Sequence, residues 1–235
     1  SDVNKNAQYF LVNDGTAFAS GAFNNTVITL GDDIDLAGKM WTPIGGGEAN
    51  NTFAGIFDGN KKTISNVIVN STYNNVGLFG RCAKNADFGV SAEVKNLTVN
   101  NATVVSPSAD AVGAVVGYGH TELKVDNVNV TGVLDIDGYR GVAAVVGKGY
   151  PDVSNTSVNA EGTIATSYWC AGGILGHSDE PCVAIENCSV SGTAGGLTID
   201  GGSYNGAGGI AGHIAGGSTI NDAFVDNVTT EGNSH

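Results

Sequence analysis

The stretch ISNVIV at residues 64–69 returns four times along the chain and once more in a looser form. The copies are VKNLTV (94–99), VDNVNV (125–130), VSNTSV (153–158), IENCSV (185–190) and INDAFV (220–225). Their central polar residues lie 30, 31, 28, 32 and 35 residues apart, and are Asn66, Asn96, Asn127, Asn155, Asn187 and Asp222. A near-constant period of this length is typical of repeat proteins, in which each repeat is one structural unit stacked on the next.

A second phrase alternates with the first throughout the repeat region. It reads GLFG (77–80), AVVG (114–117), AVVG (144–147), GILG (173–176) and GIAG (209–212). The repeats are rich in Val, Ile, Thr, Asn and Gly without the 3.6-residue apolar spacing of helices, and they lack the Leu ladder of leucine-rich repeats. The sequence therefore predicts an all-β fold, a parallel β-helix of about six coils, in which each short strand pairs with its counterpart in the next coil.

The repeated residues have distinct expected roles. The Val that closes the first phrase should form an inward column, namely Val69, Val99, Val130, Val158, Val190 and Val225. The Asn should form a column at a bend, where its amide can bond turn backbone and the Asn of the next coil. The Gly that closes the second phrase should mark another corner, where a β-branched residue would clash or need a positive φ. These glycines are Gly80, Gly117, Gly147, Gly176 and Gly212.

Composition restricts the possible functions. The chain of 235 residues has 36 Gly, only 10 Lys and Arg, and a formal charge of −13. This acidity argues against nucleic acid or an anionic membrane surface as a partner, because both require clustered positive charge. No apolar run approaches the roughly 18–20 residues of a membrane span, so no membrane insertion is expected. The sequence leaves open whether any of the four cysteines, Cys82, Cys170, Cys182 and Cys188, form a disulfide.

Residues 32–80 resemble a known family. DDIDLAGKMWTPIG (32–45), FAGIFDGNKKTISNVIV (53–69) and VGLFG (76–80) are similar to the opening of the GLUG-repeat surface proteins of bacteria, many from gut anaerobes and some attached to immunoglobulin A peptidases. The resemblance implies a right-handed parallel β-helix, a secreted or cell-surface location and an adhesion-like role. It implies no catalytic residue, because the shared motif is a folding signature.

The two ends of the chain differ from the repeats. Residues 1–45 are expected to form an N-terminal cap and the first strands, and residues 46–235 one continuous β-helix domain. Only DNVTTEGNSH (226–235) follows the last repeat. The chain is therefore expected to be a fragment of a longer protein with further domains, and its oligomeric state stays open.

Function in a solenoid should appear as a column of equivalent positions. Eight residues before the repeat Gly, three coils carry a tyrosine, and a fourth joins them if its coil is one residue shorter. The set is Tyr139, Tyr168, Tyr204 and Tyr73, with Trp169 beside Tyr168. An exposed aromatic strip of this kind would stack against sugar rings. The alternative is a structural ladder of tyrosines that covers a corner of the coil.

A second column follows directly after the repeat Gly. It consists of Arg81, Tyr118, Lys148, His177 and His213. Four cationic or protonatable side chains in so acidic a chain would suit a sialylated, sulfated or uronic-acid glycan. The alternative is that a residue after a corner Gly merely faces solvent. The two histidines lie in adjacent coils, but no third metal ligand is evident from the sequence, so neither a metal nor another cofactor is expected.

Polysaccharide cleavage is the alternative function. It needs a pair of carboxylates, or a base with a carboxylate-bound calcium. Asp135 and Asp137 share one face of an expected strand with Arg140 close by, but the neighbouring coils carry no matching acids. The acidic cluster GDDID (31–35) belongs to the motif shared with the GLUG-repeat proteins, where a folding role suffices. No complete acid/base set is visible, which argues against an enzyme.

The sequence thus predicts a non-catalytic adhesion or glycan-binding module of a bacterial surface or secreted protein. The expected partner is a glycan or a host or cell-surface protein. A polysaccharide lyase or glycoside hydrolase of the β-helix type and a purely structural stalk remain the alternatives. Acids clustered in one groove would favour the enzyme, an exposed Tyr and Trp strip would favour the binder, and burial of both columns would favour the stalk.

Overall fold

The computed structural model describes residues 27–46, 52–83, 91–120, 122–204 and 206–232. This part of the chain consists of β-strands joined by turns, arranged in three sheets whose strand pairs are parallel. None of it forms a helix long and apolar enough to cross a membrane. Residues 1–26, which carry most of the expected N-terminal cap, lie outside the described residues.

Each sheet collects one side of the successive coils. The largest sheet contains β1 (Val27–Thr29), β2 (Ile34–Asp35), β3 (Ile56–Asn70), β6 (Glu93–Ser106), β9 (Lys124–Gly138), β12 (Asp152–Ser154), β13 (Ser157–Thr166), β16 (Ala184–Glu186), β17 (Ser189–Asp200), β20 (Thr219–Asn221), β21 (Phe224–Asp226) and β22 (Val228–Glu231). The second sheet contains β4 (Asn75–Val76), β7 (Ala111–Gly113), β10 (Gly141–Ala143), β14 (Cys170–Gly172) and β18 (Ala207–Gly208). The third contains β5 (Phe79–Cys82), β8 (Val116–Gly119), β11 (Val146–Gly149), β15 (Leu175–His177) and β19 (Ala211–His213).

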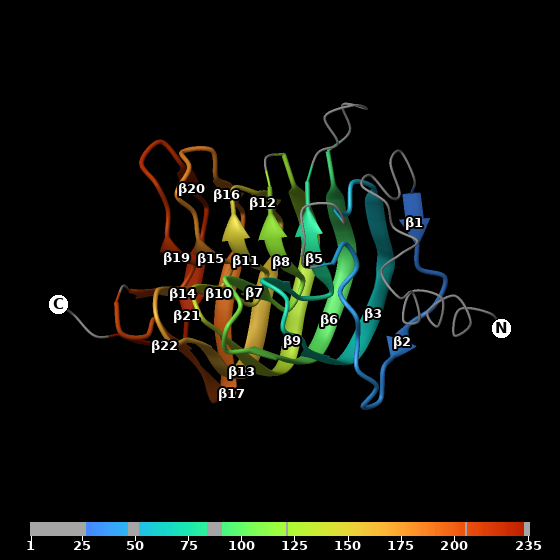
Figure 1. Cartoon of the computed structure of the whole chain (residues 1–235), viewed down its shortest axis with the longest axis horizontal. Coiled ribbons are helices and arrows are strands. Elements are labelled where there is room, and N and C mark those ends of the chain that lie inside the picture. The colour runs from blue at the N-terminus through green and yellow to red at the C-terminus, as the bar shows by residue number, and fades with distance from the viewer. Residues whose placement is uncertain (1–26, 47–51, 84–90, 121, 205, 233–235) are drawn as a thin grey trace.

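The chain visits the three sheets in turn and then begins the next coil. The coils stack along one axis, with β1 at one end of the molecule and β22 at the other (Figure 1). The structure therefore confirms the predicted β-solenoid of about six coils.

The inward column exists, but its first member was assigned wrongly. Ile64, not Val69, is in register with Val99, and the column continues through Val130, Val158, Val190 and Val225. Val69 pairs instead with Val104. The phrase ISNVIV begins at this inward position instead of ending there, because residues 57–64 are the ones that match 94–99. A bulge in β3 lets the eight residues from Phe57 to Ile64 match the six from Val94 to Val99.

The corner asparagines form two columns instead of one. Asn96, Asn127, Asn155, Asn187 and Asp222 share a bend at which φ lies between 49° and 54°. The Nδ2 of Asn127 donates to Oδ1 of Asn96 over 2.8 Å, and the Nδ2 of Asn187 donates to Oδ1 of Asn155 over 2.7 Å. Asn66 belongs to a second bend, where its Oδ1 accepts from Nδ2 of Asn101 over 3.1 Å. Asn suits both bends because its short polar side chain tolerates the left-handed conformation.

The corner glycines are required by close contact between coils. A Cβ added to Gly147 would lie 2.5 Å from both the backbone N and O of Val112, in the preceding coil. Its φ does not fall in the left-handed region, so of the two expected reasons the clash is the one that applies. The second and third sheets therefore approach each other backbone to backbone at this corner.

All four cysteines are free thiols. Cys82, Cys170 and Cys188 are buried and Cys182 is exposed. The Sγ of Cys188 lies 3.3 Å from the carbonyl oxygen of Glu186, and burial raises the pKa of the Cys82 thiol. The buried three behave as small apolar side chains of the interior.

Candidate functional site

The column after the corner Gly is a true structural column. The strand registers place Arg81 beside Tyr118, Tyr118 beside Lys148, Lys148 beside His177 and His177 beside His213. These five residues are called the outer column below. Its members do not all face solvent, because the His177 side chain is 1% exposed while His213 is exposed.

The tyrosines form a ladder whose rings cover one another. The Tyr139 and Tyr168 rings stack at 5.0 Å with an interplanar angle of 9°, and Tyr168 and Tyr204 stack at 5.1 Å and 29°. Tyr73 stands apart, because the coil between it and Tyr139 carries the buried Ala109 at this position. Stacking on each other uses the ring faces that a sugar would need, so the ladder has the geometry of a structural element more than of a sugar-binding strip.

Trp169 joins the ladder to the outer column. Its ring meets Tyr168 edge-on at 6.2 Å and lies 4.9 Å from the His177 ring. The Arg140 guanidinium lies 5.5 Å from the ring centres of both Trp169 and Tyr139. The two columns that the sequence suggested separately are therefore parts of one surface.

A polar groove with a volume of about 320 Å³ runs beside the outer column. Side chains from several successive coils line it. They are the cations Arg81 and Lys148, the phenols Tyr118 and Tyr150, the carboxylates Asp110, Asp179 and Glu180, and the amides Asn74 and Asn75, with Gly149. Of these, the sequence analysis identified only the outer-column members, because the others belong to neither repeated phrase.

Of the three cations that the structure describes in or beside the groove, two lie near a carboxylate and the third does not. Lys148 Nζ lies 3.8 Å from Asp179 Oδ2, and Arg140, at the edge of the groove, lies 3.6 Å from Asp110 Oδ1. Arg81 instead lies over the Tyr118 ring at 4.8 Å, its Nε is buried with no hydrogen-bond partner, and no carboxylate of the described residues pairs with it. Arg81 is therefore the cation most available to a ligand.

The groove also offers phenolic hydroxyl groups. The hydroxyls of Tyr118 and Tyr150 are 3.1 Å apart and share a hydrogen bond. Burial, reinforced by this bond, raises the pKa of Tyr118, so its phenol stays protonated at neutral pH. Both groups can donate or accept a hydrogen bond.

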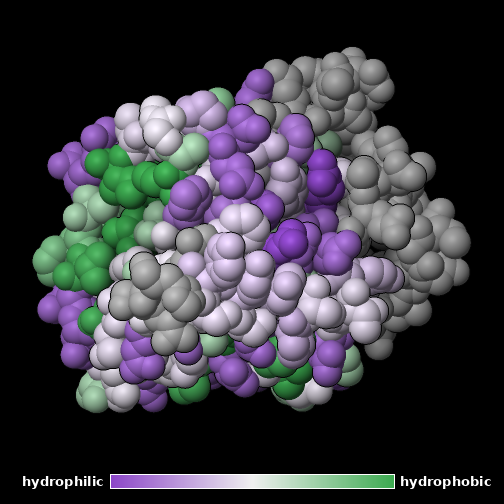
Figure 2. Space-filling view, turned by 60° about the vertical axis from the view of Figure 1, so that its left-hand side comes forward, coloured by the Kyte–Doolittle hydropathy of each residue, from purple (hydrophilic) through white to green (hydrophobic). Residues whose placement is uncertain are grey.

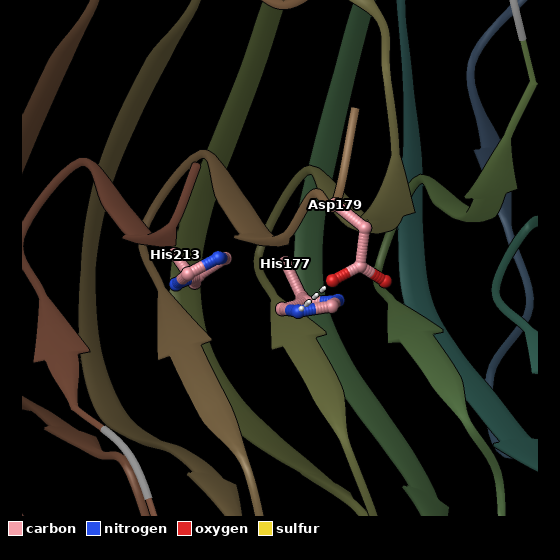
Figure 3. Close-up of side chains that lie close together, drawn as sticks. All are labelled: His177, Asp179 and His213. Atoms are coloured by element: carbon pink, nitrogen blue, oxygen red, sulfur yellow. Dashed lines mark ion pairs between the residues drawn. The ribbon is translucent and has the colours of Figure 1, made fainter. Parts of the chain in front are cut away.

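Three potential metal ligands meet at the C-terminal end of the outer column (Figure 3). His177 Nε2 lies 3.2 Å from Asp179 Oδ1, and the His177 and His213 rings stack at 5.1 Å. Burial lowers the pKa of His177 to about 4; the Asp179 carboxylate opposes this shift, and the charges of Lys148, His213 and Arg140 add to it. The sequence analysis missed Asp179, although it stands only two residues after His177.

The acidic residues considered for catalysis have no acidic register partners in the adjacent strands. Asp135 and Asp137 lie on β9 opposite Thr and non-acidic residues of the adjacent strands, as expected, and the nearby Arg140 pairs with Asp110 instead. Burial raises the pKa of Asp137, partly offset by a backbone hydrogen bond, and the Asp135 charge adds to the rise. Asp35 Oδ1 accepts hydrogen bonds from the Asn66 side chain and the Ala37 backbone, which lower its pKa. This part of the GDDID cluster has a folding role.

Comparisons with known proteins establish the fold and little else. No family model matches the chain. Halomucin from Haloquadratum walsbyi is 34% identical over 118 residues, which cover 46% of this chain and 1% of that protein. A solved structure of a putative immunoglobulin A1 protease from Bacteroides ovatus superposes with a TM-score of 0.58 at 20% identity, covering 94% of this chain and 76% of the other. At this identity the likeness shows a shared β-solenoid fold.

Proposed function

We propose that this chain is a non-catalytic, glycan-binding segment of a bacterial surface or secreted protein, and that the polar groove is its binding surface. One observation carries the proposal. Three successive coils place Arg81, Tyr118 and Lys148 at one register position along a groove of about 320 Å³. That volume is at the lower end of the range of small-ligand sites, roughly 300–1,000 Å³.

The groove chemistry suits a sugar with an acidic group. The hydroxyls of Tyr118 and Tyr150 and the amide of Asn74 can exchange hydrogen bonds with sugar hydroxyls. Arg81, which lacks a carboxylate partner among the described residues, can bind a carboxylate or sulfate through its planar guanidinium. The net negative charge of the chain repels an acidic sugar, and salt screens charges that are far apart. The attraction between Arg81 and the sugar would therefore act only at short range.

One further observation favours a binder over an enzyme, and the comparisons bear on the location. Asp110 and Asp179, two of the acids in the groove, each lie within 4 Å of a cation, which favours roles in shaping the groove. The names halomucin and putative immunoglobulin A1 protease fit a surface or secreted context. The latter likeness, with the motifs at 32–80, also supports membership of the GLUG-repeat proteins.

A glycan array tests the proposal. The purified chain would be screened against neutral, sialylated, sulfated and uronic-acid glycans beside Arg81→Gln, Tyr118→Phe and, outside the groove, Tyr204→Ala, each checked for folding by circular dichroism. We expect binding to acidic glycans, a loss of about tenfold or more in Arg81→Gln, a smaller loss in Tyr118→Phe and no change in Tyr204→Ala. Loss of binding in Tyr204→Ala alone would move the site to the tyrosine ladder, and no binding to any glycan would favour the structural stalk.

A further inference from the structure

The cluster of His177, Asp179 and His213 has a chemistry that glycan binding does not require. We infer that these three side chains form a binding site for a divalent transition-metal ion, with Zn²⁺ as the best-suited ion. Two imidazoles and one carboxylate are a ligand set that such ions prefer, whereas Mg²⁺ and Ca²⁺ prefer oxygen ligands alone. The inference does not rest on the proposed function, although Asp179 also lines the groove.

The three ligand atoms are already gathered. One atom from each side chain lies within 4.8 Å of the others. Around a tetrahedral zinc ion with bonds of about 2.0–2.1 Å, ligand atoms stand about 3.3 Å apart, so the distances between them need to shorten by up to about 1.5 Å. His213 and Asp179 are both exposed and therefore free to rotate by that amount, whereas His177 is held in the interior.

His177 supplies an independent indication of a missing partner. Its side chain is only 1% exposed, yet neither ring nitrogen has a hydrogen-bond partner. The Asp179 oxygen lies 3.2 Å from Nε2 but outside hydrogen-bond geometry, so it counts as an ion-pair contact only. Buried polar atoms without partners are rare in folded proteins, and a metal ion bound to one of these nitrogens would supply that atom with a partner.

The backbone holds the two histidines in fixed positions. His177 ends β15 and His213 ends β19, and the two residues are register partners in adjacent coils. The backbone N–H of Ser178 donates to the carbonyl oxygen of His213 over 2.9 Å and links the coils beside the cluster. In Figure 3 both rings project from neighbouring strands to the same side, and the Asp179 carboxylate turns toward His177. The open side of the site faces solvent through His213, which leaves room for a water or another ligand on the metal.

Lys148 competes with a metal for the same carboxylate. Its Nζ lies 3.8 Å from Asp179 Oδ2, and its positive charge would repel a cation in the cluster. A bound ion would therefore displace this ion pair. Replacing Lys148 with an uncharged residue of similar shape should strengthen metal binding, an effect that a nonspecific surface site elsewhere would not show.

Calorimetric titration with Zn²⁺ after treatment with a chelator tests the inference, with Co²⁺ absorption in the visible region as a second readout. We expect one equivalent of metal, binding at least tenfold weaker in His213→Ala and in Asp179→Asn, and binding a few-fold tighter in Lys148→Met. Both weakened variants change exposed side chains, so folding should survive; circular dichroism would check this. His120→Ala is the matched control, because His120 lies outside the cluster, and it should bind as the unaltered chain does.

Two results would overturn the inference. One is a dissociation constant weaker than about 1 mM for the unaltered chain, which corresponds to only about 4 kcal/mol of binding free energy. The other is binding that persists at full strength in His213→Ala and Asp179→Asn, because the metal would then be held elsewhere.

Discussion

The inner column of aliphatic residues and the outer column both follow the register of the strands, but they differ in residue type and in burial. In the inner column, from Ile64 to Val190, every coil repeats a β-branched aliphatic side chain, and none is more than 1% exposed. In the outer column five coils carry four residue types, whose side chains range from buried to exposed. Packing against the coils on both sides therefore fixes the inner residues, whereas each coil can vary its outer residue independently.

The last coil shows that burial depends on the neighbouring coils. Val225 continues the inner column in register, yet it is 43% exposed because no described coil covers it. Ile220 and Phe224 are exposed in the same coil. Figure 2 shows the resulting hydrophobic surface at the C-terminal end of the solenoid.

The largest loss of stability is expected when a corner glycine is replaced by a larger residue. Gly147→Val places a branched side chain where even a Cβ would lie 2.5 Å from the backbone of Val112. We expect a loss of more than about 4 kcal/mol in the free energy of unfolding, or failure to fold, in urea denaturation followed by circular dichroism. Gly206→Ala is the control, because a Cβ there meets nothing within 4 Å, and its effect should stay within about 0.5 kcal/mol. Equal effects of the two changes would refute the close-contact explanation.

A matched pair of substitutions compares the two columns directly. Val130→Ala opens a cavity in the inner column and should lower the free energy of unfolding by about 2–3 kcal/mol. Lys148→Met changes the outer column of the same coil and should alter it by less than about 1 kcal/mol, because a partly exposed ion pair contributes little. Similar losses in both variants, measured by the same denaturation, would show that the outer residue is constrained by packing as well.

His177 differs from the other residues of the outer column because its side chain is buried. Its pH dependence therefore tests the comparison between the two columns. Its folded pKa is about 4, below the ordinary value of 6.5, so the unfolded chain binds the proton first. The contribution of His177 to the free energy of unfolding should therefore be fully present above pH 6.5 and decrease as the pH drops toward 4. We expect a loss of about 2 kcal/mol from this group, less than the full shift implies, because solvent around the exposed Asp179 and His213 beside the ring reduces the cost of charging it.

Denaturation at several pH values in the presence of a chelator measures this loss. His177→Gln should flatten the curve between pH 6.5 and 4 relative to the unaltered chain. An unchanged slope in that variant would assign the pH dependence to other groups, such as His120, whose pKa is also lowered by burial.

The repeat predicted most of the fold because the same residues recur where the same packing recurs. It failed in the first coil, where ISNVIV (64–69) matches the later phrase in letters but begins one bend further along the coil. Asn followed by an apolar residue occurs at both bends, at Asn96 in one and at Asn66 and Asn101 in the other, so residue identity alone cannot distinguish them. Only the strand pairing, with its bulge between Asp58 and Lys62, reveals the register.

The sequence predicted the separate columns of the candidate site, but not the surface that they form together. Equivalent positions follow from the period, which is why the outer column and the tyrosine ladder were found. The contact between Trp169, which precedes β14, and His177, which ends β15, links two different sheets, and no spacing in the sequence encodes it. The sequence also could not reveal that the tyrosine rings would cover each other, since that depends on side-chain rotamers.

The stacking direction has a mechanical consequence. Neighbouring coils are joined by hydrogen bonds that run along the solenoid axis, and β1 and β22 lie at opposite ends of it (Figure 1). Tension between the ends would pull along these bonds and load the outermost coil first, so the coils should peel away singly. Each detached coil of about 30 residues releases roughly 100 Å of extended chain. A surface protein built with such a segment would have a tether that lengthens in steps under shear instead of breaking at once.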